Sequence, residues 1–494
     1  MKRALCKLFV IVLVLMHSLS GTAAAAVNTG IGAQYNGQDI VFTDAAPKII
    51  NGRTMVPFRQ ILETMGATVT FDQQTQRVLV SKPDVEFSFM IGGTDITIKK
   101  DGAATVKKMD VAPFLDQQTN RTYVSARFMA ESMGNSVFWD QDAQTAVIID
   151  QTSIFANADQ DFSIISKLLT MEMDLQKSYE TTGSFQADVA ISEKAAGADN
   201  LSMSFAGDMS GITQKSSAEM TMNMVINADN ALASLSAEEK AQAQPILDML
   251  KSITMKIKMD GESGSMYMNS NIFSLMDPSF TPNTWFKMNL FETYDKMGID
   301  LRPMMSLNKS ERSISELLQA YVMSMNSGTV DSYQEMKIGY AFMKNLLGDQ
   351  AFSTTVSGSD KTHTLNLDKY DILAAISKTA MTEGIPMDSE ALAEMTDAFR
   401  EIALNADIVI KLKDGKLSNY DLMGNVSLED MALAFHQAGD PQSSRVQMTM
   451  DQPELMTMTL SVDSSYVVTT KSPDLTLPAD AKVVDYSSAA MLAE

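Results

Sequence analysis

Two stretches of the chain carry the same order of apolar and polar positions, Arg53 to Val80 and Arg121 to Ile148, an offset of 68 residues. Beyond Arg53 and Arg121 themselves, the residues that recur at this offset are Thr54, Val56, Arg59, Glu63, Met65, Gly66, Val69, Asp72, Gln73 and Gln76, which return as Thr122, Val124, Arg127, Glu131, Met133, Gly134, Val137, Asp140, Gln141 and Gln144. Ordered identity of this density predicts a tandem repeat at the front of the protein.

Each copy predicts a strand, a short helix and a second strand. Apolar residues at the helical spacing i, i+3, i+4, i+7 give the helix one buried stripe. The stripes are Phe58, Ile61, Leu62 and Met65 in the first copy, and Ala126, Met129, Ala130 and Met133 in the second. Gly66 and Gly134 follow where a helix ends on a left-handed residue. Asp72 and Asp140 then open the next turn.

Both predicted helices carry an Arg and a Glu four residues apart, Arg59 with Glu63 and Arg127 with Glu131. These charges could clamp a ligand, or they could form the solvated face of each helix. Exposed pairs of this order stabilise a helix by only about 0.3 kcal/mol. The solvated face is the interpretation that we favour.

The V-P-F-R start, the E-x-M-G-A run and the aromatic-Asp pair resemble the copper amine oxidase N-terminal-like (stalk) domain of secreted bacterial proteins. The resemblance covers about residues 35 to 150 and is present in both copies. The second copy departs from it with Ser125 for Pro57 and Asn135 for Ala67. It implies a non-catalytic accessory α+β module attached to another domain.

The first 26 residues have the layout of a secretory signal. The basic residues Lys2, Arg3 and Lys7 flank a short apolar run, Leu8–Met16, and the segment ends in the small residues Ala23–Ala26. The run is too short to span a bilayer, so we expect cleavage near Ala26 and export. Cys6 precedes the apolar run, which argues against a lipoprotein.

Net charge and cysteine content exclude several classes of site and partner. The chain has a net charge of −22 and a single cysteine, which lies in the predicted signal. The predicted mature chain would therefore hold no disulfide, thiolate metal site or cysteine nucleophile. So acidic a chain repels nucleic acid and anionic lipid. We expect no transmembrane segment after signal cleavage.

Strand patterns over residues 85–108, with a turn at Gly92-Gly93 and another at Asp101-Gly102, complete the first domain, predicted as residues 27–150. Residues 151–160 show no periodicity and are predicted to be a linker. The second domain would then span residues 161–494.

Residues 161–494 alternate between strand and helix patterns, which predicts an α+β fold with a large antiparallel sheet. Helices are expected at 162–179, 236–250, 313–347 and 369–400; strands at 185–191, 201–209, 218–226, 253–269, 283–290, 351–367, 406–426 and 446–462; and an edge segment at 475–486. The leading helix, the long strands, the WFKMN strand and the closing LPADAKVVDY segment weakly resemble the lipoprotein-carrier (LolA/LppX-like) type. That resemblance implies a half-barrel over an apolar groove.

Methionine is unusually common, with 39 residues in the chain. Many form Met-x-Met rows: Met220, Met222 and Met224; Met266 and Met268; Met448 and Met450; Met456 and Met458. Thioethers could bind Cu(I), line a groove for variable lipids, or fill a core. The residues between them are mostly polar, and residues two apart on a strand share a face. We therefore predict an inward apolar row, in a core or a groove, rather than a copper site.

The chain lacks the residues of a copper amine oxidase. That family uses three histidines and a tyrosine within Thr-x-x-Asn-Tyr-Asp/Glu. Asn419-Tyr420-Asp421 is present here, but Lys416 replaces the threonine. Beyond the predicted signal only His363 and His436 remain, too few for the copper site. The oxidase interpretation fails.

Other catalytic signals are equally weak, because the chain has no nucleophile elbow, P-loop, zincin or dinucleotide motif. A Ser/His/Asp triad would need His363 or His436, which we predict to be surface or partly buried strand residues. The acidic pairs Glu238/Glu239 and Glu429/Asp430 could suggest glycosidase carboxylates. Such pairs are expected in a chain with 61 acids. We assign no catalytic, cofactor-binding or metal residue, and no cofactor.

The sequence favours an exported, non-catalytic protein of the cell surface or cell wall whose C-terminal domain binds an apolar or amphiphilic ligand such as a lipid. The alternative is a structural or adhesion module that grips a wall polymer or a surface protein. A hydrolase that uses two of the many carboxylates is a third hypothesis.

Overall fold

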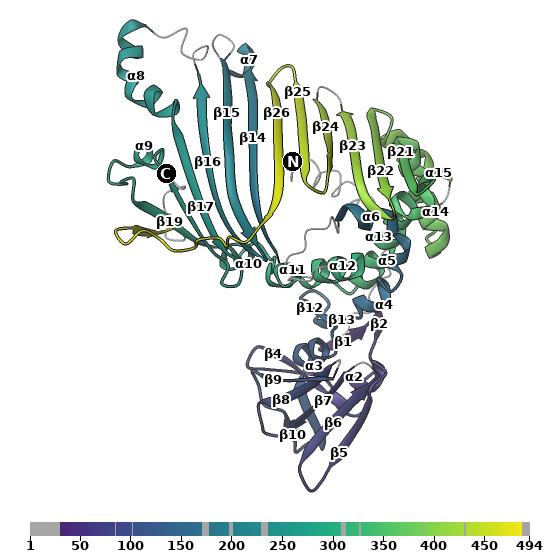
Figure 1. Cartoon of the computed structure of the whole chain (residues 1–494). Coiled ribbons are helices and arrows are strands. Elements are labelled where there is room, and N and C mark those ends of the chain that lie inside the picture. Colours follow the sequence, from purple (N-terminus) through teal and green to yellow (C-terminus); the bar gives the residue numbers. More distant parts are fainter. Residues whose placement is uncertain are drawn as a thin grey trace. The chain divides into compact units, whose positions relative to one another are not determined.

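The computed structural model describes residues 30–83, 85–100, 102–169, 177–196, 201–228, 236–307, 313–325, 328–387, 389–428 and 431–486 (Figure 1). The predicted signal lies outside these residues. The fold is α+β, as predicted. Two compact units divide the chain: Met1–Asn157 with Leu318–Ala341, and Ala158–Leu317 with Phe342–Glu494.

The first unit holds three small sheets and the two repeat helices. Their orders are β12-β13-β1-β2, β10-β11-β4-β3 and β5-β6-β7-β8-β9. The strands are β1 (Gly32–Tyr35), β2 (Gln38–Asp39), β3 (Lys48–Ile50), β4 (Arg53–Pro57), β5 (Thr68–Asp72), β6 (Arg77–Lys82), β7 (Val85–Met90), β8 (Asp95–Lys100), β9 (Ala103–Lys108), β10 (Phe114–Asp116), β11 (Arg121–Ser125), β12 (Ser136–Asp140) and β13 (Thr145–Ile149). The helices are α2 (Phe58–Thr64), α3 (Ala126–Ser132) and α4 (Gln151–Ile154).

The predicted repeat is confirmed, since β4 with α2 and β11 with α3 have the same bounds at the repeat offset. The two copies meet through equivalent strands: β4 pairs antiparallel with β11, and Val56 lies opposite its own counterpart Val124. Both valines are fully buried. The helical stripes are buried as predicted, except that Met133 is only partly buried.

The predicted helix ends are confirmed in both copies. Gly66 has φ +78° and Gly134 has φ +79°, the left-handed conformation that other residues rarely adopt. The amide of Gly66 donates to the carbonyl of Glu63 at 3.0 Å, and the amide of Ala67 to that of Leu62 at 2.9 Å. This pair of bonds is a Schellman motif, which satisfies the last helical carbonyls.

The repeated aspartates open equivalent turns but differ in their second oxygen. Asp72 accepts from the amide of Gln74 at 2.8 Å and from the hydroxyl of Thr75 at 2.8 Å. In the second copy Ala143 replaces Thr75. The free oxygen of Asp140 accepts instead from the amide of Val330 at 3.0 Å. Because the second copy lacks the threonine hydroxyl, the second carboxylate oxygen of Asp140 is available to bind the backbone at Val330, far along the chain.

The extra strands predicted over residues 85–108 are confirmed as β7, β8 and β9. The turn at Gly92 has the expected positive φ of +82°, whereas Asp101 lies outside the described residues. Residues 151–160, predicted to be a linker, hold the one-turn helix α4 and the start of α5 (Ala158–Asp161).

The second unit is built on one sheet of 14 strands, in the order β20-β21-β22-β23-β24-β25-β26-β14-β15-β16-β17-β18-β19-β27. Its neighbours pair antiparallel, except that β27 runs parallel to β19. The strands are β14 (Ser178–Ile191), β15 (Leu201–Gln214), β16 (Ser217–Asn227), β17 (Ile253–Asp260), β18 (Ser265–Ser270), β19 (Thr284–Asn289), β20 (Ser353–Ser357), β21 (Asp360–Asp368), β22 (Ile402–Lys413), β23 (Lys416–Leu428), β24 (Met431–Asp440), β25 (Ser443–Gln452), β26 (Met456–Thr469) and β27 (Lys482–Asp485).

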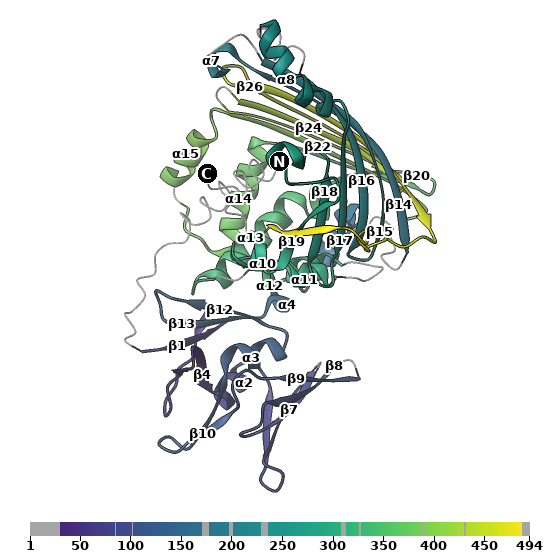
Figure 2. The same ribbon diagram turned by 90° about the vertical axis from the view of Figure 1, so that its left-hand side faces the viewer.

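The remaining helices lie between sets of strands along the chain. They are α6 (Ser163–Leu169), α7 (Glu193–Ala196), α8 (Ala237–Leu250), α9 (Phe273–Met276), α10 (Leu290–Asp295), α11 (Arg302–Met305), α12 (Ile314–Met323), α13 (Ser332–Leu347), the 3-10 helix η1 (Asp349–Ala351), α14 (Lys369–Glu383) and α15 (Ser389–Ala398). The sheet is curved, and α10 and α14 lie on its concave side (Figure 2).

One predicted boundary in the second unit is wrong. A helix was expected from Phe162 to Tyr179, but α6 ends at Leu169 and β14 has begun by Ser178. The strand extends this far because it pairs along its whole length with β15 on one side and β26 on the other. Backbone hydrogen bonding to two neighbouring strands stabilises the strand conformation near Tyr179 more than the local sequence pattern favours a helix.

Candidate functional site

The register of the large sheet brings the Met-x-Met rows together on one face. Met222 lies opposite Met209 on one neighbouring strand and Met255 on the other. Fourteen methionines share this face across β15–β19, β25 and β26: Met203, Met209, Met220, Met222, Met224, Met255, Met259, Met266, Met268, Met288, Met448, Met450, Met456 and Met458. With their apolar neighbours, which include Phe185, Val189, Phe205, Phe435 and Leu460, they form what we call the methionine face.

The opposite face of the same strands is polar and exposed. There the side chain of Asn223 donates to Asp208 at 3.0 Å and accepts from Thr254 at 3.2 Å. Asp188 similarly accepts from Thr459 at 3.4 Å, on another pair of strands. The alternation predicted for these strands is confirmed, with methionines on one side and a hydrogen-bonded polar surface on the other.

The methionine face is uncharged, although the protein carries a net charge of −22. On β24–β26 and β14–β19, the strand residues of the described chain that share this face include no Asp, Glu, Lys or Arg. An amphiphilic or apolar ligand would therefore meet no formal charge along the strands themselves.

Described elements pack on the two ends of the face, and between them it is partly buried. At one end Ile164 of α6 packs on Ile410 and Tyr420. At the other end the ring of Phe286 makes edge-on contacts with Phe273 and Phe280, at 4.7 and 5.0 Å between ring centroids. Between them every methionine of the face except Met448 remains partly accessible. A large apolar face that is only partly buried is a candidate binding surface.

Both histidines beyond the predicted signal lie on strands of the large sheet, His363 on β21 and His436 on β24. His363 was predicted to be a surface or partly buried residue, but it is 7% exposed, so that prediction is wrong. It lies opposite the fully buried Ile410, and its Nδ1 is 2.8 Å from the hydroxyl of Thr354. Burial lowers its pKa. His436 is half-exposed, with its Nε2 3.0 Å from Asp421 on the neighbouring strand.

Two of the remaining catalytic candidates are engaged in packing or in capping a helix. Tyr420, in the Asn-Tyr-Asp run, is 2% exposed on β23, and burial raises its pKa. Glu239 completes the predicted capping box of α8 with Ser236, and these hydrogen bonds lower its pKa. The pair Glu429/Asp430 lies outside the described residues.

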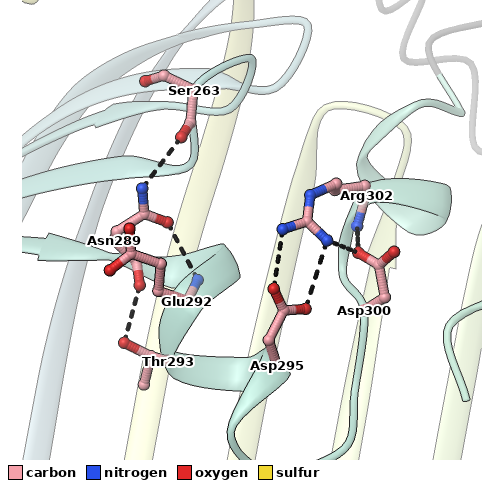
Figure 3. Close-up of polar contacts among 7 residues, drawn as sticks. All are labelled: Ser263, Asn289, Glu292, Thr293, Asp295, Asp300 and Arg302. Atoms are coloured by element: carbon pink, nitrogen blue, oxygen red, sulfur yellow. Dashed lines mark hydrogen bonds and ion pairs between the residues drawn. The ribbon is translucent and has the colours of Figure 1, made fainter. Parts of the chain in front are cut away.

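Arg302, Asp295 and Asp300 form a group of ion pairs, which we call the clamp, between α10 and α11 (Figure 3). The guanidinium of Arg302 bonds both oxygens of Asp295, at 2.8 and 3.4 Å, and Asp300 at 2.8 Å. It also lies over the ring of Phe291, 5.0 Å from the centroid. Two carboxylates neutralise this cation, so the clamp fixes the α10–α11 connection instead of binding an anion.

Metal and membrane signals are equally limited. Nowhere in the described part of the chain do His, Cys, Asp and Glu gather in the threes that a metal ion would need. Among these residues, none of the helices combines the length and the apolar character required to span a bilayer.

Comparison with known proteins identifies part of the chain. Residues 34–148 match the copper amine oxidase N-terminal domain. This confirms the resemblance predicted from the repeat. The copper amine oxidase N-terminal domain is a non-catalytic module, and the match does not extend to a catalytic domain. No curated protein matches the chain.

Solved structures add little. The outer membrane protein Omp33 of Acinetobacter baumannii aligns over 60% of this chain and all of its own, at 5% identity and a TM-score of 0.12. A mutant of the Rh. blastica porin aligns over 58% of this chain and 99% of its own, at 8% identity and the same TM-score. Alignments this poor carry no argument about the second unit.

Within the matched residues 34–148, the paired helix charges are solvated. Arg59 and Glu63 are 3.5 Å apart, Arg127 and Glu131 are 4.0 Å apart, and all four side chains are more than half exposed. The interpretation as a solvated face therefore holds better than that of a ligand clamp.

Proposed function

We propose that this protein is an exported, non-catalytic binding protein of the cell surface or cell wall. Its second unit takes up an apolar or amphiphilic ligand on the methionine face. The copper amine oxidase N-terminal domain serves as its accessory module.

The observation that carries this proposal is an uncharged, methionine-lined surface left partly open in a strongly acidic protein. Methionine side chains are flexible and polarisable, so they adapt to apolar partners of different shapes. A surface that served only as core would be expected to be closed over its middle as it is at its ends. The wall-polymer alternative has less support, because Phe71 is the only exposed aromatic among the described residues of the repeat module.

The test uses an apolar fluorescent dye and two glutamate variants on one strand. Met450 lies on the methionine face, and its neighbour Thr449 lies on the opposite, exposed face. Met450→Glu should abolish dye uptake, because it places an unpaired charge on the apolar surface. Thr449→Glu should leave uptake unchanged. Equal uptake by both variants, with both folded, would refute binding on this face.

Export is tested separately, by intact-mass measurement of the protein in culture supernatant. Cleavage near Ala26 should yield a chain that begins close to Val27. Recovery only in the membrane fraction, with the first residues retained, would refute this part of the proposal.

A further inference from the structure

One end of the methionine face changes from apolar to polar side chains without gaining charge. Five neutral polar residues from β23–β26 gather there, which we call the hydroxyl cluster: Tyr420, Gln437, Ser444, Ser464 and Tyr466. They continue the same rows. On β26 the residues of this face run from Tyr466 and Ser464 to Leu460 and Met458.

The cluster contains two hydrogen-bonded groups. The hydroxyls of Ser444 and Ser464 are 2.9 Å apart, and that of Ser464 is 3.0 Å from the hydroxyl of Tyr466. The amide of Gln437 donates to the hydroxyl of Tyr420 at 3.2 Å. Tyr420 is buried, whereas Ser444, Ser464 and Tyr466 are partly accessible. A hydroxyl offers one donor and two acceptor positions, so these three keep hydrogen-bonding capacity for a polyhydroxylated partner.

The surroundings disfavour a charged head group. The carboxylate that acts on Tyr420 is that of Asp440, which raises the tyrosine's pKa along with burial, the main cause. That carboxylate is already engaged by the amides of Gln442 and Ser443 and by the Ser443 hydroxyl. An anion would find no Lys or Arg among the residues of this face on β23–β26, because Arg445 lies on the opposite face and pairs with Asp463. A cation would find the carboxylate of Asp440 already occupied by these hydrogen bonds.

We propose that the ligand is an amphiphile with an uncharged, hydroxyl-bearing head group. The head lies at the hydroxyl cluster and the acyl or alkyl chain lies along the methionine face. This inference rests on the proposed function. From Ser464 to Met456 the strand extends roughly 26 Å, which accommodates a long chain.

The test compares three amphiphiles that share a dodecyl chain and differ only in the head: the maltoside, the sulfate and the trimethylammonium salt. Each displaces the apolar dye from the full-length protein, below its micelle concentration, while circular dichroism monitors the fold. The maltoside should bind at least about tenfold more tightly than either ion, because a charge gains no partner at the cluster.

Removing cluster hydroxyls should weaken the maltoside alone. Tyr466→Phe combined with Ser464→Ala should lower its affinity about three- to tenfold, as expected for neutral hydrogen bonds, while dye affinity stays the same. Ser461→Ala, which removes a hydroxyl from the opposite face of β26, should change neither affinity.

The outcomes separate the two proposals. Dye uptake without preference for the maltoside, or a preference that survives loss of the cluster hydroxyls, overturns the head-group assignment alone. Failure of every probe to bind overturns the proposed function with it. A concentration-dependent dimer that Met450→Glu dissociates would show that a second copy occupies the face, and would also overturn the assignment.

Discussion

The ring of Phe185 fills the space that a side chain at Gly207 would need. The two residues lie directly opposite each other on β14 and β15. A Cβ built on Gly207 would come within 2.7 Å of the phenyl Cζ and 2.1 Å of the carbonyl oxygen of Asn223. Backbone and ring are therefore packed in contact at the centre of the methionine face, and only glycine fits.

Gly207→Ala should consequently destabilise the second unit by about 1–3 kcal/mol, the usual cost of overpacking. Gly424→Ala is the matched control, because position 424 is on the same sheet and a Cβ there meets nothing within 4 Å. Urea unfolding of both variants measures the difference. Equal stability of the two would show that the packing around Gly207 is not as close as the structure indicates.

The helix ends of the repeat give a second prediction. Gly66→Val should cost about 1–2 kcal/mol through its left-handed backbone alone, since a Cβ there meets no neighbour. Hydrogen exchange of the full chain should accelerate at the amides of α2 and leave the large sheet unaffected. Gly66→Asn, which tolerates this conformation better, should have a smaller effect.

The repeated aspartates provide their own control. Asp140→Ala removes both a turn and the acceptor of the Val330 amide, whereas Asp72→Ala removes only an exposed turn. The first variant should therefore lose about 1–2 kcal/mol more, the cost of leaving a partly buried donor unpaired. Hydrogen exchange should accelerate at Val330 in Asp140→Ala only. Unchanged exchange there would contradict the assigned role.

Acid should loosen the segment that follows β26. The amine of Lys258 bonds the carbonyl oxygens of Asp474 and Thr476 at 2.6 and 2.7 Å and the carboxylate of Asp474 at 3.3 Å. Hydrogen bonds from Thr476 and then Lys258 lower the pKa of Asp474 from 3.8 to about 2. The folded pKa lies below the unfolded one, so this stabilisation is complete above about pH 4 and is lost as the pH falls towards 2.

Asp474→Asn should remove that part of the acid sensitivity. The measurement is proteolysis within residues 471–478 as a function of pH, for the wild type and the variant. Wild type should become more susceptible between about pH 4 and pH 2, whereas the variant should be susceptible throughout. Identical profiles would exclude a role for this carboxylate.

Leucine substitution separates the apolar face from a copper site. Met222→Leu and Met268→Leu keep volume and hydrophobicity, so each should cost less than about 1.5 kcal/mol and preserve dye uptake. If sulfur instead holds Cu(I), the same changes should remove metal binding, because a methylene cannot coordinate copper. Competition titration with Cu(I) beside dye fluorescence distinguishes the two. Tight copper binding that leucine abolishes, without dye uptake by the wild type, would overturn the proposed function.

Much of the fold could be predicted because its signals are local. The hairpin of β22 and β23 turns at Asp414 and Gly415, whose φ angles of +51° and +78° match what the Asp-Gly pair favours. The Met-x-Met rows likewise revealed one apolar side of each strand. Alternation is a property of a few consecutive residues, so it survives in the fold unchanged.

What could not be predicted depends on contacts between distant residues. The packing of 318–341 with the first unit includes the bond from Val330 to Asp140, and its one trace in the sequence is Ala143 in place of Thr75. The pairing of β26 with β14 follows from sheet order, which alternation does not encode. The burial of His363 likewise depends on parts of the chain distant in sequence. For the same reason the sequence could not show that the methionine face would be covered at its ends and only partly buried between them.

The antiparallel pairing of Val56 with Val124 places a local two-fold axis between the repeats. A strand that meets its own counterpart in this way forms the kind of contact found at the interface of a symmetric dimer. The N-terminal module thus has the organisation of two subunits fused into one polypeptide. Fusion relaxes the constraint that both halves remain identical, because each surface now faces only one partner. Ser125, which caps α3 where Pro57 cannot cap α2, shows this asymmetry developed in one half alone.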